Sequence, residues 1–342
     1  MMRALLAAVA CLALALFARS GAAVPSGAVS DAAIMTTEYP PLLSAFGFFK
    51  GGADRPSAAL TAYSLGTPLF TDYAEKQRFI YLPSDGRLAI ETGGRVKFPV
   101  GTALVKSFGY PDVAGKLNII ETRLLLHRPE GWVALPYVWR ADGSDAELKL
   151  GGARVPVTIR HAGEKDQAIS YAVPNKNQCK QCHSSKDKTE PIGPNWSNMI
   201  FAEKADKERL AGKASFPRGG LFADAVWNDP KSGSVEKRAL AYLRINCGHC
   251  HRPTGSASNS GLFFDDMIGG DTAIGIGKRP VAAGRGSGNF DFVIEPGYPE
   301  RSILLYRLKS TDPGIAMPEV GRATVHKEGA ELLEQWIGEM KP

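Results

Sequence analysis

The chain has 342 residues, of which 44% are hydrophobic and 22% charged, and its formal net charge is +6. These values are ordinary for a folded protein of about two domains, and they exclude a disordered chain, a collagen-like repeat and a bundle of membrane spans. The sequence has no long run of like charges and no basic stripe with interleaved aromatic residues, so we expect no nucleic-acid partner.

The N-terminus has the pattern of a secretory signal peptide. Arg3 precedes an apolar stretch at 4–17, and small residues follow up to Ala23. This stretch is too short for a membrane-spanning helix, so we expect cleavage after Ala23, a periplasmic location and no transmembrane segment in the mature chain. Lipid attachment at Cys11 is the alternative.

The segment 24–174 predicts a β-rich domain. Strand-like runs at 78–83, 97–108, 117–126 and 132–140 are broken by Gly, Pro and Asp. Further along, Val155, Val157 and Ile159 alternate with other residues, which is the period of two of a half-buried strand. We therefore expect an antiparallel, sandwich-like β-domain, and an α+β multidomain fold for the whole chain.

After Pro174 the pattern changes to turns and helices. Helices are expected at 200–210, 235–245 and 327–340, and Ser234 is placed to cap the second of them. The glycine-rich stretch 268–288 lacks the spacing of a phosphate-binding loop. We expect it to be a loop that lines a neighbouring site.

Four of the five cysteines form two copies of the pattern CxxCH. Two thiols at this spacing reach two vinyl groups on one edge of a porphyrin, and a histidine directly after the second thiol is then placed beneath the iron. The motifs therefore predict two covalently bound haem c groups. The attachment points are Cys179, Cys182, Cys247 and Cys250, and the axial histidines are His183 and His251.

Other chemistries of paired cysteines fit the pattern less well. A zinc site joins two CxxC pairs across a gap of roughly 15 to 20 residues, whereas Cys182 and Cys247 lie 65 positions apart. Zinc also gives no reason for a histidine after each pair. A redox-active disulfide opens a helix in a βαβ setting, which this sequence lacks.

The surroundings of the second motif resemble class I cytochrome c. A helix at 235–245 leads into the motif, the stretch GIAMPEVGR follows it, and a last helix at 327–340 contains Trp336. The resemblance implies that Met317, which precedes a proline, is the distal iron ligand. We accordingly divide the chain into a signal peptide at 1–23, a β-rich domain at 24–174, a first haem-binding segment at 175–233 and a cytochrome c-like domain with the second haem at 234–342.

The first motif lacks these surroundings, so its distal ligand stays open. A strand and a turn precede Cys179 instead of a helix. The segment IGPNWSNM resembles the Gly-Pro segment that packs on the haem in cytochromes c, and its Met199 is one candidate for the distal ligand. Met267 and a histidine of the β-domain are the others.

The remaining histidines are expected to be structural. His161 continues the inward face of its strand and is expected in the core, where a histidine with satisfied hydrogen bonds is common. His127 and His326 have charged neighbours and are expected at the surface. His249, between the cysteines of the second motif, is expected to face outward.

Three stretches are similar to an uncharacterised bacterial family of secreted two-haem c-type cytochromes with a β-rich N-terminal domain. They are YPPLLSAFGFFKGG with TPLFTDYAEKQRFIYLP, then LAYLRINCGHCHRPTGSASNSGLFF, and finally PVAAGRGSG with PGYPERSILLYRLKSTDPGIAMPEVGR. The resemblance covers nearly the whole mature chain. It implies two covalent haems and export, and it assigns no substrate to the protein.

We therefore expect a periplasmic two-haem c-type cytochrome that transfers single electrons between redox partner proteins. Histidine and methionine together close an iron to small ligands and raise its potential, which suits one-electron transfer. The alternative is a two-haem peroxidase-like oxidoreductase in which the first iron keeps an open position. A third interpretation makes the β-domain a module that binds carbohydrate or protein, although no residue pattern names its ligand.

Overall fold

The computed structural model describes residues 28–160, 165–186, 188–218, 221, 224–265, 269–281 and 284–342. The predicted signal peptide, His161 and Met267 lie outside the described residues. Within the described ranges, none of the helices has the length and apolar character needed to cross a membrane.

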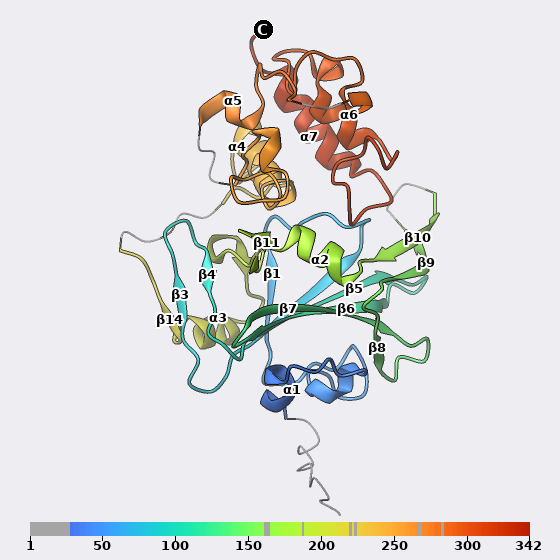
Figure 1. Cartoon of the computed structure of the whole chain (residues 1–342), viewed down its shortest axis with the longest axis vertical. Coiled ribbons are helices and arrows are strands. Elements are labelled where there is room, and N and C mark those ends of the chain that lie inside the picture. The colour runs from blue at the N-terminus through green and yellow to red at the C-terminus, as the bar shows by residue number, and fades with distance from the viewer. Residues whose placement is uncertain are drawn as a thin grey trace, which may run out of the picture.

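One seven-stranded sheet forms the centre of the N-terminal half (Figure 1). Its strands follow the order β13-β1-β2-β5-β6-β7-β8, and every neighbouring pair is antiparallel. Each of the four strand-like runs predicted from the sequence overlaps one strand of this sheet, so the antiparallel β-rich half is confirmed. The bounds are β1 Thr61–Leu65, β2 Glu75–Tyr81, β5 Ala103–Pro111, β6 Leu117–Arg128, β7 Gly131–Trp139, β8 Ala146–Leu148 and β13 Met199–Ile200.

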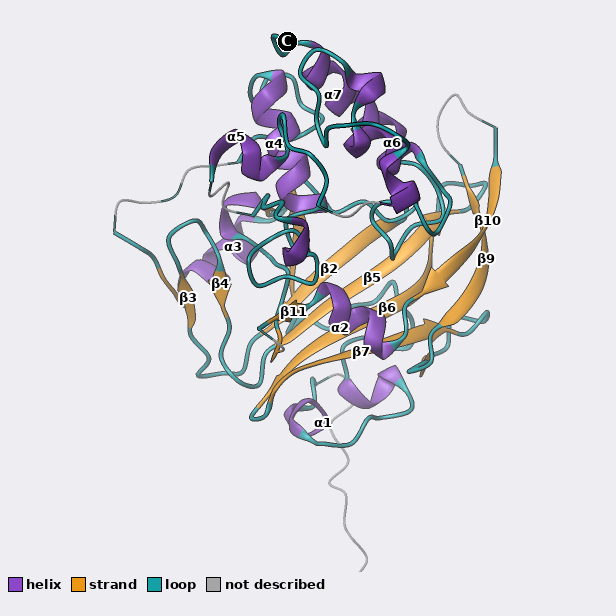
Figure 2. Ribbon diagram, turned by 45° about the horizontal axis from the view of Figure 1, so that its top comes forward, coloured by secondary structure: helices purple, strands orange, loops and turns teal. Residues whose placement is uncertain are grey.

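The two faces of this main sheet have different neighbours (Figure 2). On one face, α1 (Asp31–Met35) and the 3-10 helix η1 (Leu43–Phe46) complete a core that includes Val105. On the other face lie α2 (Lys176–Cys182) and, beyond it, the C-terminal helices. Side chains alternate along a strand, so β5 sends Val105 to the first face and Lys106 to the second.

Smaller sheets stand beside the main sheet. The hairpin of β9 (Ala153–Ile159) and β10 (Gln167–Val173) packs on Phe108 and Ile120. A three-stranded sheet contains β3 (Leu88–Ile90), β4 (Val96–Lys97) and β14 (Ala214–Ser215), and a two-stranded one contains β11 (Ser184–Ser185) and β12 (Lys188–Thr189). The expected sandwich is therefore realised only in part, because in the described ranges helices and small sheets, and no second large sheet, cover the main one.

Helices dominate the C-terminal half. The bounds are α3 Lys204–Ala211, α4 Val235–Asn246, α5 Gly270–Ile274, α6 Ile303–Lys309 and α7 Lys327–Gly338. The three predicted helices correspond to α3, α4 and α7, and Ser234 caps α4 by accepting a hydrogen bond from the backbone N–H of Lys237. The short helices α5 and α6 were not predicted. Leu243 of α4 and Trp336 of α7 share one buried core.

The segment 175–233 is interwoven with the β-rich half. It adds β13 to the edge of the main sheet, where Met199 pairs with Leu65. It also adds β14 to the small sheet, where Ala214 pairs with Leu88. The first CxxCH motif is therefore carried by a segment that shares two sheets with the preceding 150 or so residues of the chain.

The loop 67–73, between β1 and β2, joins the two halves. Asp72 is only 2% exposed. Its carboxylate accepts hydrogen bonds from the backbone N–H of Ala323 at 2.7 Å, the N–H of Thr324 at 2.8 Å and the Thr324 hydroxyl at 2.9 Å. The ring of Phe70 stacks on that of His326, with the centroids 4.2 Å apart. These contacts fix residues 323–326 relative to the main sheet.

Replacing Asp72 by alanine is expected to lower the free energy of unfolding by about 3 kcal/mol, because buried N–H groups lose an ionised acceptor. Asp72 also has a φ of 45°, which alanine rarely adopts. The control is Asp112→Ala, which removes an exposed carboxylate that accepts from two backbone N–H groups of a turn. Urea denaturation compares the variants, and an equal loss in both would contradict a special role for Asp72.

Candidate cofactor site

The first CxxCH motif forms a short helix against the main sheet. Asn175 caps α2, and its side chain and that of Gln178 form a reciprocal capping box. The expected strand precedes the motif, but the short helix α2 begins at Lys176 and includes both cysteines, with His183 as its C-cap. Because residues three positions apart share one face of a helix, the thiols of Cys179 and Cys182 lie on the same side of α2.

His183, the last residue of this motif, is held in one protonation form. The β11–β12 hairpin brings Glu190 back to His183, so that the Nδ1 atom lies 3.0 Å from the Glu190 carbonyl oxygen. A carbonyl oxygen only accepts hydrogen bonds, so Nδ1 carries the proton and Nε2 keeps its lone pair. Burial lowers the pKa of His183 to about 4, so the ring is neutral near pH 7.

The second motif follows the C-terminal end of α4, where Cys247 N–H donates to the Leu243 carbonyl at 2.8 Å. The Nδ1 atom of His251 lies 3.0 Å from the Ser260 hydroxyl, and that hydroxyl donates to the Ala257 carbonyl at 2.6 Å. The hydroxyl has one proton, so Nδ1 of His251 is the donor and Nε2 again keeps its lone pair. Burial lowers the pKa of His251 to about 4.

The two motifs meet in space although they lie far apart in the sequence. The sulfur atoms of Cys182 and Cys250 and one ring nitrogen of His249 lie within 4.8 Å of one another. Next to them, the Arg252 guanidinium donates to the Ser184 carbonyl at 3.1 Å. All four motif cysteines are free thiols. A hydrogen bond from the Cys182 thiol lowers the pKa of Cys250 well below its ordinary value.

A cavity of about 930 Å³ lies between the main sheet and the motifs, near the upper end of the size range of cofactor sites. Residues from both motifs, from the loop after Met317 and from the sheet are among those that line it. The first motif contributes Cys179, Cys182 and His183, the second motif contributes His249, and the loop after Met317 contributes Pro318, Val320 and Arg322. Side chains of β2, β5, β6 and β7 form the wall on the side of the sheet.

Met317 lies half-buried in the loop between α6 and α7. Its backbone N–H donates to the Arg307 carbonyl at 3.0 Å, and the Arg307 side chain donates to the Ile315 carbonyl at 2.8 Å. Arg307 of α6 thus holds this loop through hydrogen bonds, and its charge adds to burial in lowering the pKa of His251. The next residue, Pro318, lines the cavity.

The candidates for the first distal ligand are placed differently. Met199 packs against the buried cluster of Leu88 and Ile90, and it is not among the described residues that line the cavity. His127 does line the cavity, with its ring stacked on Trp132 at a centroid distance of 4.4 Å. Its Nδ1 lies 3.0 Å from the Phe98 carbonyl oxygen, so Nε2 of the neutral ring is unprotonated.

Three expectations for the histidines are wrong. His326 is buried at 8% exposure, with Nδ1 2.9 Å from the Tyr242 hydroxyl. His249 lines the cavity, and its Nδ1 is buried and has no partner within the described residues. His127 is half-buried in the cavity wall. The period of two could have indicated the position of His127, because it places His127 on the same strand face as Arg123 and Leu125. The charged neighbours of His127 in the sequence suggested a solvated position instead.

Comparison of the chain with protein-family models, with curated proteins and with solved structures finds no match. The chemistry of the site therefore has to be argued from its own residues. Four free thiols in CxxC pairs, each pair followed by a histidine with an unprotonated Nε2, are the donor set that covalent haem requires. A closed zinc site fits less well, because in the described ranges only three donors converge.

Proposed function

We propose that this protein is a two-haem c-type cytochrome that transfers single electrons between redox partner proteins. The observation that carries the proposal is the fixed tautomer of both motif histidines, because an imidazole bound through Nδ1–H offers Nε2 to a metal. The haems would be attached at Cys179 and Cys182 and at Cys247 and Cys250, with His183 and His251 as axial ligands. Bound haem supplies a reversible one-electron iron couple.

The arrangement of the thiols favours electron exchange inside the protein. Cys182 and Cys250 belong to different motifs, yet both sulfur atoms lie within the same 4.8 Å group. Cofactors attached at these adjacent sulfur atoms would be close neighbours. The chain would contribute a partly enclosed cavity, the two proximal imidazoles and, from the loop between α6 and α7, the Met317 thioether.

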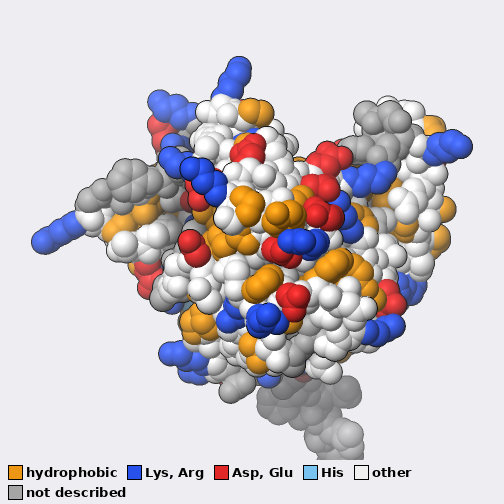
Figure 3. Space-filling model, turned by 90° about the horizontal axis from the view of Figure 1, so that it is seen from above, with side chains coloured by type: hydrophobic (Ala, Val, Ile, Leu, Met, Phe, Trp, Pro, Cys, Tyr) orange, Lys and Arg blue, Asp and Glu red, His pale blue; other side chains and the backbone are white. Residues whose placement is uncertain are grey.

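The proposal includes export, because haem c is attached outside the cytoplasm and the N-terminus has a signal-peptide pattern. Its partners would be other redox proteins. Figure 3 shows the face at the end with the C-terminal helices, where acidic, basic and hydrophobic side chains are mixed. A partner that docks on this face would therefore meet no broad field of one sign.

Expression of the full chain in cells that attach haem c is expected to give a periplasmic protein with two covalent haems. Mass spectrometry of the denatured protein measures them. The double variant Cys179→Ala with Cys182→Ala is expected to lose one haem and keep the other, and Cys247→Ala with Cys250→Ala provides the matched comparison. A wild-type mass without haem would contradict the proposal. Zinc bound by Cys182, His249 and Cys250 would identify a metal site instead.

Met317→Ala is expected to convert one of the two haems from low-spin to high-spin or water-ligated iron and to lower its reduction potential, because thioether ligation favours reduced iron. Met340→Ala is the control, since Met340 is a half-buried methionine that packs against the C-terminal core. Optical spectra and a redox titration follow both variants. A Met317→Ala spectrum identical to wild type would exclude this residue as the ligand.

We further propose His127 as the distal ligand of the first haem, because its ring lines the cavity and the bond of its Nδ1 to the Phe98 carbonyl leaves Nε2 as the lone-pair nitrogen of the neutral ring. His127→Leu is expected to make one haem high-spin, whereas Met199→Leu is expected to leave both spectra unchanged. Electron paramagnetic resonance of the oxidised protein distinguishes the two states. A wild-type protein with one high-spin iron that turns over peroxide would instead support the peroxidase-like alternative.

A further inference from the structure

Three basic side chains stand opposite one another on the cavity face of the main sheet. Arg78 of β2 is in register with Lys106 of β5, and Lys106 is in register with Arg123 of β6. All three line the cavity, and we call them the cation row. Like charges directly opposite on neighbouring strands destabilise a sheet. Burial, together with the charges of Arg78 and Arg123, lowers the pKa of Lys106 well below its ordinary value.

Only one end of the cation row has a counter-charge. Glu121 is fully buried, forms an ion pair with Arg123 and accepts a hydrogen bond from the Tyr171 hydroxyl at 2.5 Å. In the described part of the chain, no carboxylate comes within ion-pair distance of Arg78 or Lys106. Two of the three cations therefore face the cavity without an anion from the described residues.

Arg78 shows the missing counter-charge most clearly, because this residue is 6% exposed and lies in the wall of the cavity. Its Nη1 atom has one weak contact, to the Lys76 carbonyl at 3.4 Å, and its Nη2 atom is buried with no hydrogen-bond partner within the described residues. A buried guanidinium nitrogen without an acceptor costs free energy, and a carboxylate is the acceptor that fits it best. The site therefore calls for an anionic ligand.

The cation row borders the first motif. The charges of Lys106 and Arg123 add to burial in lowering the pKa of His183, and the Arg123 charge also acts on the Cys179 thiol. A group attached to the first motif thus shares the cavity with the row. Arg78, one strand beyond Lys106, lies at the end of the row away from Arg123.

We propose that the cation row binds the two propionate carboxylates of the first haem. This inference rests on the proposed function, since it assumes haem at Cys179 and Cys182. The carboxylates would supply the missing negative charge between Arg78 and Lys106 and an acceptor for the unpartnered Nη2 atom. A soluble oxyanion such as phosphate offers the same chemistry, and the experiment separates the two sources.

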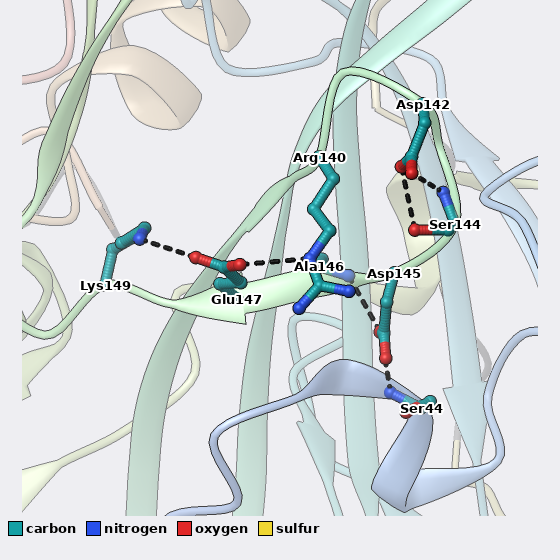
Figure 4. Close-up of polar contacts among 8 residues, drawn as sticks. All are labelled: Ser44, Arg140, Asp142, Ser144, Asp145, Ala146, Glu147 and Lys149. Atoms are coloured by element: carbon teal, nitrogen blue, oxygen red, sulfur yellow. Dashed lines mark hydrogen bonds and ion pairs between the residues drawn. The ribbon is translucent and has the colours of Figure 1, made fainter.

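The test is a redox titration of the two-haem protein and its Arg78→Met variant in chloride buffer. Loss of a nearby cation favours oxidised iron, so one haem is expected to show about a tenfold higher ratio of oxidised to reduced form at a fixed potential, about 59 mV. Arg78→Lys keeps the positive charge, so its ratio of oxidised to reduced haem is expected to lie close to that of the wild type. The control is Arg140→Met, since Arg140 is exposed and paired with Glu147 at 3.0 Å on the β7–β8 hairpin (Figure 4).

A second variant and a second measurement complete the test. Lys106→Met is expected to lower the reduction potential of the same haem without a change of its spin state. In both variants, the potential of that haem should begin to fall at a higher pH than in the wild type. Added phosphate is expected to leave the wild-type titration unchanged, and a shift with phosphate that Arg78→Met abolishes would show that the row binds a soluble oxyanion instead.

Three further results would overturn the inference. A two-haem protein whose Arg78→Met and Lys106→Met titrations match that of Arg140→Met would overturn this inference alone. Conversion to high-spin iron in Lys106→Met would make Lys106 an iron ligand and would equally overturn it. A denatured mass without haem would overturn the proposed function and this inference together.

Discussion

The buried carboxylate of Asp72 connects the two halves of this protein. It belongs to the loop between β1 and β2, and it accepts hydrogen bonds from Ala323 and Thr324, about 250 residues further along the chain. The neighbouring Phe70 binds the end of α4 through Asn246 Oδ1, directly before the second CxxCH motif. The same short loop thus holds the last turn before one motif and the residues that follow the Met317 loop. The cavity exists because these contacts bring the helical half onto the open face of the sheet.

The chemistry of the site depends on neutral imidazoles and on unbalanced charge. Burial keeps the motif histidines neutral, and the Glu190 carbonyl and the Ser260 hydroxyl each fix the proton on Nδ1. On the side of the sheet, the buried carboxylate of Glu121 is paired with Arg123 and Tyr171. The cavity thus joins the His183 ring, whose Nε2 is unprotonated, to cations that have no anion among the described residues. The haem proposed for the first motif would meet both features, with its iron and with its carboxylates.

The β-rich half contributes to the site more than the division into domains implies. Strands β2, β5 and β6 supply the cation row, and β6 also supplies His127. The segment 175–233 joins the edge of the same sheet through Met199 and Leu65. A β-domain that acts only as a separate binding module would have no reason to place buried basic side chains on the face that meets the motifs. Its architecture fits a role as one wall of the cavity that borders the motifs.

The sequence by itself determined the features that depend on local spacing. Strand-like runs broken by Gly, Pro and Asp predicted the main strands, the period of two predicted β9, Ser234 marked the start of α4, and the CxxCH spacing located both motifs. The sequence did not predict the contacts between distant segments, because neither the period of a strand nor the spacing of a motif specifies which strand and helix faces pack together. The approach of Cys182 to Cys250, the register of Arg78 with Lys106 and Arg123, and the place of His127 in the cavity wall each arise when separate segments pack together. Only the tertiary structure decided these, since burial and charge balance are properties of the assembled cavity.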